Sequence, residues 1–193
     1  MVRKILILII CGIVTICSSA QESLHIDELQ HAYIKKDWSS FADAFPKTFS
    51  DFMELYGYDF HDGAKPLYDV AFEHISFLFS DERITEPQFL DKLLMLTEGY
   101  YWAADATSYL QMGIEDIIKG KPETIAGFMK TKPDVLVKDF LKCAIATPHP
   151  EPENTHYYQD YLKTMKLYED ISPQIVQLFV EAHQELMSEW IEH

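Results

Sequence analysis

The sequence predicts an all-α protein, a single helical domain over residues 21–193 built as an orthogonal helical bundle or a short array of helical hairpins. Apolar residues recur three and four positions apart along most of the chain, which is the period of an amphipathic helix. Capping residues, prolines and glycines divide this pattern into segments of helical length. No stretch alternates apolar and polar residues between turn signals, so we expect almost no sheet. The segments predict about eight or nine helices.

The first helices are marked by their caps. Ser23 and Asp37 can each cap a short helix, and Pro46 interrupts the second. Thr48 caps a third helix, which ends at Gly57. The stretch FPKTFSDFMELYGYD is dense in aromatic rings because its apolar residues form one buried face, at Phe49, Phe52, Met53 and Tyr56.

After a loop over residues 57–65, the pattern returns to helices. They are expected from Pro66 to Phe79, from Thr85 to Gly99, from Tyr100 to Lys119, from Pro122, from Pro133, from about Thr155 and from Pro173 after a Ser172 cap. In the first of these, Val70 is expected to face inward. Residues 147–154 hold three prolines and form a linker-like loop.

Residues 1–20 are typical of a secretory signal peptide. Arg3 and Lys4 precede an apolar run over residues 5–16, and small residues before Gln21 predict cleavage after Ala20. We therefore expect a periplasmic or secreted protein.

Two alternatives to cleavage are weaker. A retained membrane anchor needs about 20 apolar residues, more than this run offers. Lipidation at Cys17 normally follows a small residue, whereas Ile16 stands there. The remaining cysteine, Cys143, lies in an apolar context typical of a buried, unreactive thiol.

The charge limits the partners. The chain carries 16 Lys and Arg against 31 Asp and Glu, a formal net charge of −15. Loss of Arg3 and Lys4 with the leader makes it more negative still. Such a charge repels nucleic acid and anionic lipid and favours a basic partner protein. Arg83, the one arginine that follows the leader, leaves almost no candidate for bidentate capture of phosphate.

Three polar side chains in the YDFHDG loop could bind a ligand. Asp59, His61 and Asp62 offer oxygen and imidazole donors within four residues, enough for part of a metal site. No second ligand set accompanies them at a defined spacing. A solvated acidic loop is the favoured interpretation, and we expect no bound metal.

Two further polar residues stand within helical patterns. His74 falls on an inward face, where a neutral core histidine with a satisfied hydrogen bond is favoured over a pH-sensing or ligand role. Asp105 lies one turn from Trp102 and Tyr109, where it can be a buried polar anchor bonded to a tyrosine hydroxyl or a helix N-terminus, or, less favoured, a catalytic acid.

Motifs for catalysis are lacking in this sequence. The EAHQE segment lacks the His-Glu-x-x-His spacing of zinc proteases, and phosphate loops, nucleophile elbows and CxxC pairs are missing. We expect no enzymatic activity and no cofactor.

Three segments in order, FPKTFSDFMELYGYD, PLYDVAFEHISFLF and GYYWAADATSYLQ, resemble a group of small exported helical proteins of Bacteroidetes-type bacteria. These proteins are associated with contact-dependent toxin loci as candidate immunity proteins. The similarity extends over residues 38–190, and its motif positions are those expected of core and caps.

The resemblance implies a protein that binds and neutralises a toxic effector in the cell envelope by occlusion. A basic toxin would suit the acidic charge. The alternative is a secreted helical protein that binds a ligand or serves as a structural component of the envelope. If a ligand site exists, Asp59, His61, His74 and Asp105 should converge on one pocket.

Overall fold

The computed structural model describes residues 26–103, 105–147 and 156–191. The chain divides into two compact units, one ending at Phe45 and the other beginning at Pro46. The expected leader with Cys17 lies outside the described residues, so its cleavage stays a prediction. None of the described helices combines the length and the apolarity that crossing a membrane requires.

The described part of the first unit is helical. One helix covers residues 26–35 and ends at Lys36, which adopts a left-handed φ of 56°. Helix α2 (Trp38–Ala44) follows, and its expected cap is confirmed because the Asp37 carboxylate accepts a hydrogen bond from the Ser40 N–H at 3.2 Å.

The second unit confirms the all-α prediction. In chain order it contains α3 (Phe49–Tyr56), β1 (Tyr58–Asp59), β2 (Gly63–Ala64), the 3₁₀ helix η1 (Tyr68–Val70), α4 (Ala71–Leu78), the 3₁₀ helix η2 (Glu82–Thr85), α5 (Pro87–Leu96), α6 (Ala106–Gly120), α7 (Pro122–Met129), α8 (Asp134–Ile145), α9 (His156–Lys166) and α10 (Pro173–Ile191). The two short strands pair antiparallel in the expected loop. The described residues hold 10 helices, close to the eight or nine predicted.

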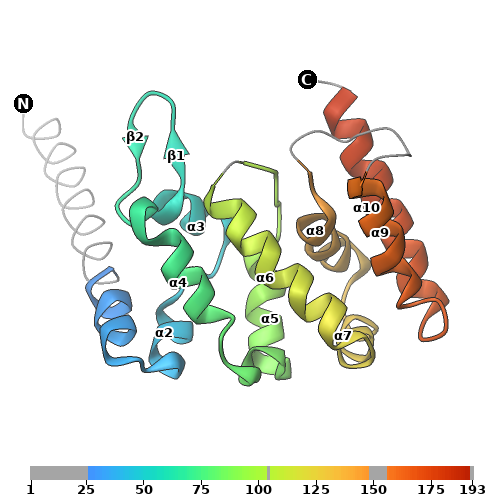
Figure 1. Cartoon of the computed structure of the whole chain (residues 1–193), viewed down its shortest axis with the longest axis horizontal. Helices are drawn as coiled ribbons and strands as arrows, with labels where there is room; N and C mark the ends of the chain where they lie inside the picture. Colours follow the sequence, from blue (N-terminus) through green and yellow to red (C-terminus); the bar gives the residue numbers. More distant parts are fainter. Residues whose placement is uncertain (1–25, 104, 148–155, 192–193) are drawn as a thin grey trace, which may run out of the picture. The chain divides into compact units, whose positions relative to one another are not determined.

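Helix α8 is central to the second unit. It packs against α10, α6 and α5, and α6 in turn packs against α4 and α7. Helices α4, α6, α8 and α10 therefore follow one another, as in an array of helical hairpins (Figure 1). Their shared core consists of fully buried apolar side chains, among them Leu110, Ile114, Ile118, Val137, Phe140, Leu141, Ile175 and Phe179. Burying each large side chain stabilises the fold by about 1.5–3 kcal/mol.

A glycine sets the distance between α4 and α6. The ring of Phe79, just after α4, lies against the backbone of Gly113 in the middle of α6. A Cβ atom at position 113 would lie 2.2 Å from Cδ2 of that ring. The close approach explains why a glycine occupies a helix interior, where it is otherwise unfavourable.

The predicted start at Pro66 is wrong, and helix α4 begins five residues later. The Leu67 N–H is already bonded to the Leu55 carbonyl at 2.8 Å, and the Lys65 N–H to the Gly57 carbonyl at 3.1 Å. These bonds hold the chain beside α3, so regular helix begins only at Ala71. Val70, expected to face inward, is exposed.

The predicted cap at Thr85 is also wrong. Asp81 accepts a hydrogen bond from the Arg83 N–H at 3.0 Å and starts the 3₁₀ helix η2, which ends at Thr85. The Thr85 hydroxyl donates to the Glu82 carbonyl. Helix α5 starts at Pro87, because proline suits the first helical position.

The third difference concerns the segment before α6. Residues 101–103 are not helical, and α6 starts at Ala106 rather than at Tyr100. Gly99 has a φ of 71° and donates its N–H to the Asp139 carboxylate at 2.9 Å, which redirects the chain. Asp105 then adopts a φ of 63°.

Other sequence expectations are confirmed. Thr48 and Ser172 accept hydrogen bonds from the N–H groups of Asp51 and Ile175 as caps. Gly57 ends α3, although in an extended conformation with φ of −73° rather than the left-handed one typical of a C-terminal glycine.

Cys143 is fully buried in α8, as expected, and it is the free cysteine of the described residues. Burial raises the pKa of its thiol well above the ordinary value. The neighbouring Tyr100 is buried as well, and its hydroxyl finds no hydrogen-bond partner among the described residues. A neutral, inaccessible thiol is not a nucleophile.

Candidate functional site

The β1–β2 hairpin extends beyond the N-terminal end of α4 (Figure 1). The Asp59 carboxylate accepts hydrogen bonds from the backbone N–H of His61 at 2.7 Å and of Asp62 at 3.0 Å. These two bonds, that from Asp62 first, lower the pKa of Asp59. Asp59 therefore serves mainly as the acceptor that shapes the turn.

The three side chains of this loop do not gather a metal site. His61 and Asp62 are exposed. No group of three or more His, Cys, Asp or Glu side chains arranged to hold a metal ion occurs within the described parts of the chain. His61 and Asp62 thus face solvent, and the expectation that no metal binds at this loop stays a prediction.

The hairpin presents aromatic rings to solvent. Phe60, at its tip, is 97% exposed, and Tyr58 is 53% exposed. The two rings meet edge to face, with centroids 6.1 Å apart. A phenylalanine side chain that is almost fully exposed does not stabilise a core. Aromatic rings are enriched in protein interfaces, so Phe60 is a candidate for contact with a partner.

A tyrosine connects the hairpin with helix α6. The ring of Tyr68, in η1, lies 5.7 Å from that of Tyr58. Its hydroxyl donates a short hydrogen bond to the Asp105 carboxylate at the start of α6. This bond, followed by desolvation, raises the pKa of Tyr68 to about 12, so the phenol stays protonated and remains a donor at neutral pH.

Asp105 has an unusual backbone. Its φ of 63° and ψ of −105° lie outside the left-handed helical region, in conformations usually left to glycine. Holding a non-glycine residue there costs about 1–3 kcal/mol, and such strain is concentrated at functional sites. The prediction of a tyrosine partner and a helix N-terminus is met, but the side chain is exposed and not buried, because α6 starts after it.

A second ring pair continues the patch along α4 and α6. Tyr109 lies one helical turn after Asp105, and its ring centroid is 5.3 Å from that of Phe72, which is 53% exposed. We name the whole patch the aromatic–acidic surface. It comprises Tyr58, Asp59, Phe60, Asp62, Tyr68, Asp69, Phe72, Asp105 and Tyr109.

The charge of this surface is negative. Asp62 and Asp69 are exposed and make no ion pair with any described residue. Lys65, a nearby cation, is partly exposed and pairs with Glu54 at 3.1 Å, and the charges of Asp59 and Asp62 also help to raise its pKa. Around the rings, carboxylates thus outnumber lysines, and Asp62 and Asp69 form no ion pair among the described residues.

His74 does not belong to this surface. It is buried in α4, and its Nδ1 lies 2.9 Å from the hydroxyl of Tyr56, whose pKa is raised by burial. The inward orientation that the sequence predicted is confirmed, and the geometry is that of a satisfied core pair.

The structure therefore brings Asp59, His61 and Asp62 to the same end of the unit as Asp105, through Tyr58 and Tyr68. These residues and His74 do not converge on one pocket. Sequence reasoning placed Tyr109 near Asp105 but missed the other four rings of the surface, which are those of Tyr58, Phe60, Tyr68 and Phe72. The one signal in the sequence was a phenylalanine, Phe60, placed among polar residues in the YDFHDG loop.

The chain matches no protein-family model, and no curated protein and no solved structure matches it. The resemblance to exported immunity-type proteins therefore stays a prediction.

Proposed function

We propose that this chain is an exported binding protein of the immunity type, which neutralises a basic effector protein in the cell envelope by covering it with the aromatic–acidic surface. The observation that carries this proposal is the set of solvent-exposed rings on Tyr58, Phe60 and Phe72, held by secondary structure and surrounded by carboxylates. Interfaces concentrate their binding energy in such rings.

Charge selects the class of partner. With a net charge of −15 and unpaired carboxylates at the surface, the protein attracts a cationic protein and accelerates its association. The same charge disfavours nucleic acid and anionic lipid. Inhibition by occlusion needs a stable, complementary surface and no catalytic group, so the proposal assigns no enzymatic activity to the chain.

The geometry of the surface suits rigid docking. The Tyr68–Asp105 hydrogen bond ties the hairpin end to α6, and the Asp59 turn fixes the tip that carries Phe60. Rings that are already positioned lose little conformational entropy when a partner binds. We therefore expect loss of the rings to weaken binding mainly through faster dissociation.

The test is a toxicity assay. Products of the genes adjacent to this one are expressed with export to the periplasm of a sensitive strain, with or without this protein exported alongside. Rescue by the full protein, lost when residues 1–20 are deleted, would support periplasmic immunity. If no neighbouring product is toxic, or if toxicity is not relieved, the proposal is wrong.

Surface variants connect the assay with the structure. Phe60→Ser combined with Tyr58→Ser should abolish rescue and raise the Kd for the effector by at least about 100-fold, since hot-spot rings each contribute about 2 kcal/mol or more. Val135→Ser is the matched control, because Val135 is 63% exposed on α8 outside the surface. Equal rescue by the double variant would remove the surface from the mechanism.

The alternative function, binding of a small ligand, is favoured by one observation. Two adjoining cavities lie where α8, α9 and α10 meet, at a distance along the chain from the aromatic–acidic surface.

A further inference from the structure

The two cavities form one cleft. They share four lining residues, Ile145, Thr147, Tyr157 and Tyr161, from the end of α8 and the first turns of α9. The larger cavity has a volume of about 180 Å³ and the smaller one about 40 Å³. A cavity of about 150 Å³ has room for benzene, so the larger one is big enough for a single ring.

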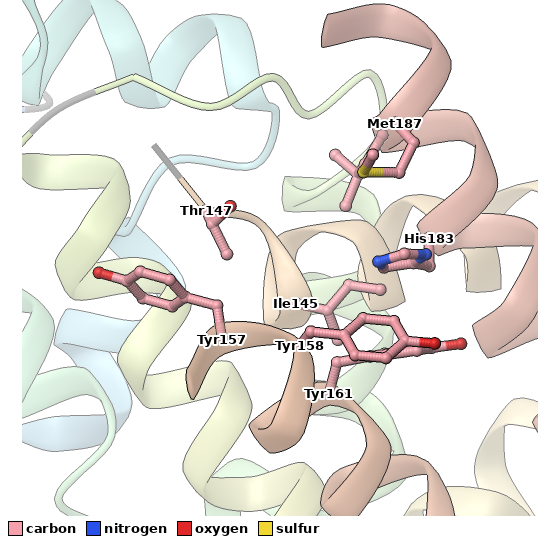
Figure 2. Close-up of a pocket in the computed structure, with 8 residues that line it drawn as sticks. Ile145, Thr147, Tyr157, Tyr158, Tyr161, His183 and Met187 are labelled. Atoms are coloured by element: carbon pink, nitrogen blue, oxygen red, sulfur yellow. The ribbon is translucent and has the colours of Figure 1, made fainter. Parts of the chain in front are cut away.

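One end of the cleft is aromatic. The imidazole of His183, on α10, stacks on the Tyr161 ring at 4.4 Å with an interplanar angle of 15°. Tyr158 lies 5.6 Å from the same imidazole, and Met187 completes this wall (Figure 2). The walls are thus built from polarisable groups that favour a flat or cationic ligand.

The imidazole of His183 does not repel a bound cation. It is half-buried, and burial lowers the pKa of its imidazole below the ordinary value of 6.5. At neutral pH it is therefore uncharged. The other histidine at the cleft, His156, is exposed and packs on Tyr157 at 4.2 Å.

The other end of the cleft is acidic. Glu115 from α6 and Asp160 from α9 line the larger cavity. Each pairs with a lysine that is not part of the lining, Glu115 with Lys119 and Asp160 with Lys163 at 3.0 Å. Both pairs join residues three or four positions apart on one helix, and such pairs contribute little, so a cation bound in the cavity can compete with them.

A backbone carbonyl adds to the polar wall. The Ala146 carbonyl accepts a hydrogen bond from the Gln111 side-chain amide, and both residues line the larger cavity. The wall therefore presents acceptors and two carboxylates, while among the described residues no lysine or arginine lines either cavity.

We propose that this cleft is a binding site for a small organic ammonium ion that carries one ring. The ring lies against Tyr157 and Tyr161, which line both cavities, and the charged nitrogen points to Glu115 and Asp160. Cation–π attraction to the tyrosine faces and charge attraction to the carboxylates act together on such a ligand. This site is independent of the aromatic–acidic surface and does not rest on the proposed immunity function.

The test compares three probes on the full mature chain by isothermal titration calorimetry and NMR. 2-Phenylethylammonium has both the ring and the charge, 2-phenylethanol has the ring alone, and n-butylammonium has the charge alone. We expect 2-phenylethylammonium to bind at least about tenfold more tightly than either of the others, which corresponds to one absent favourable interaction. Chemical shifts of Tyr157, Tyr161 and His183 should move on binding.

Variants locate the charge. Asp160→Asn and Glu115→Gln should each weaken binding of 2-phenylethylammonium by about five- to tenfold, whereas Asp170→Asn, an exposed control outside the lining, should leave it unchanged. Circular dichroism would verify that each variant is folded. Absence of binding at about 10 mM probe, equal binding of 2-phenylethanol or butylammonium, or equal weakening by Asp170→Asn would each overturn the proposal.

Discussion

Carboxylates form ion pairs where α8 packs against α10, a contact that we call the α8–α10 seam, but several of those at the aromatic–acidic surface do not. In the seam, Lys138 pairs with Glu181 and Glu185, and Lys142 pairs with Asp139 and Glu189. Burial lowers the pKa of Lys142, but hydrogen bonds and charge from Asp139 and Glu189 more than offset it, and the net pKa is raised.

At the aromatic–acidic surface, Asp62 and Asp69 form no ion pair with a described residue, and exposed aromatic rings belong to the same surface. The contrast shows that net charge alone does not locate a binding site. The carboxylates of the seam are paired with lysines of the same fold, whereas carboxylates at the surface can still pair with a partner protein.

The largest expected effect comes from breaking the seam. Lys142→Gln leaves Asp139 and Glu189 beside a neutral side chain, and we expect it to lower the free energy of unfolding by about 2–4 kcal/mol. Lys163→Gln, which removes an exposed pair, should change it by less than about 0.5 kcal/mol. Urea unfolding followed by circular dichroism measures both. Similar values for the two variants would contradict the contrast.

The next effect concerns the support of the surface by α4 and α6. Gly113→Ala should lower the free energy of unfolding by about 1–3 kcal/mol, because the new methyl group would clash with the Phe79 ring. Gly127→Ala, in α7 with open space around its Cα, should raise it by about 0.5–1 kcal/mol. Thermal unfolding of the Gly113→Ala and Gly127→Ala variants distinguishes the cost of the clash from the gain in helix propensity. Stabilisation by Gly113→Ala would show that α4 and α6 can move apart.

A smaller effect depends on pH. Because the folded-state pKa of His183 is lowered, the unfolded chain takes up a proton first as pH falls below about 6.5, and stability should decrease as pH drops from 6.5 toward the folded pKa. His183→Gln should flatten this slope in urea unfolding between about pH 7 and pH 5. His61→Gln, at an exposed hairpin position, serves as the control, and an unchanged slope for His183→Gln would refute the assignment.

The smallest effect on stability is expected at the surface itself. Phe60→Ser removes a ring that is 97% exposed, so the free energy of unfolding should change by less than about 0.5 kcal/mol. A loss of more than about 1 kcal/mol would mean that the ring packs within the fold and is not presented to a partner.

Local signals in the sequence predicted much of the fold. Thr48 and Ser172 act as caps because a hydroxyl next to a helical pattern can satisfy the first free N–H groups, whatever the rest of the chain does. The inward orientation of His74 followed from helical spacing alone. These features depend on residues within one turn of each other.

Features that depend on distant residues could not be predicted. The helix expected from Tyr100 begins at Ala106 because Gly99 bonds to Asp139, forty residues away. Pro66 does not open a helix because Leu67 is bonded to Leu55. Tyr68 lies 37 residues before Asp105 in the chain, and only the position of η1 places its hydroxyl beside that carboxylate.

The buried thiol of Cys143 has a consequence for following how this protein opens. A reagent that modifies thiols can reach it only when α8 separates from its neighbours, so its labelling rate reports how often the centre of the array opens. In the chain without its leader no other cysteine would compete for the reagent. An effector bound at the surface, or an ammonium ion bound in the cleft, would then slow the labelling of the Cys143 thiol, although that sulfur touches neither ligand.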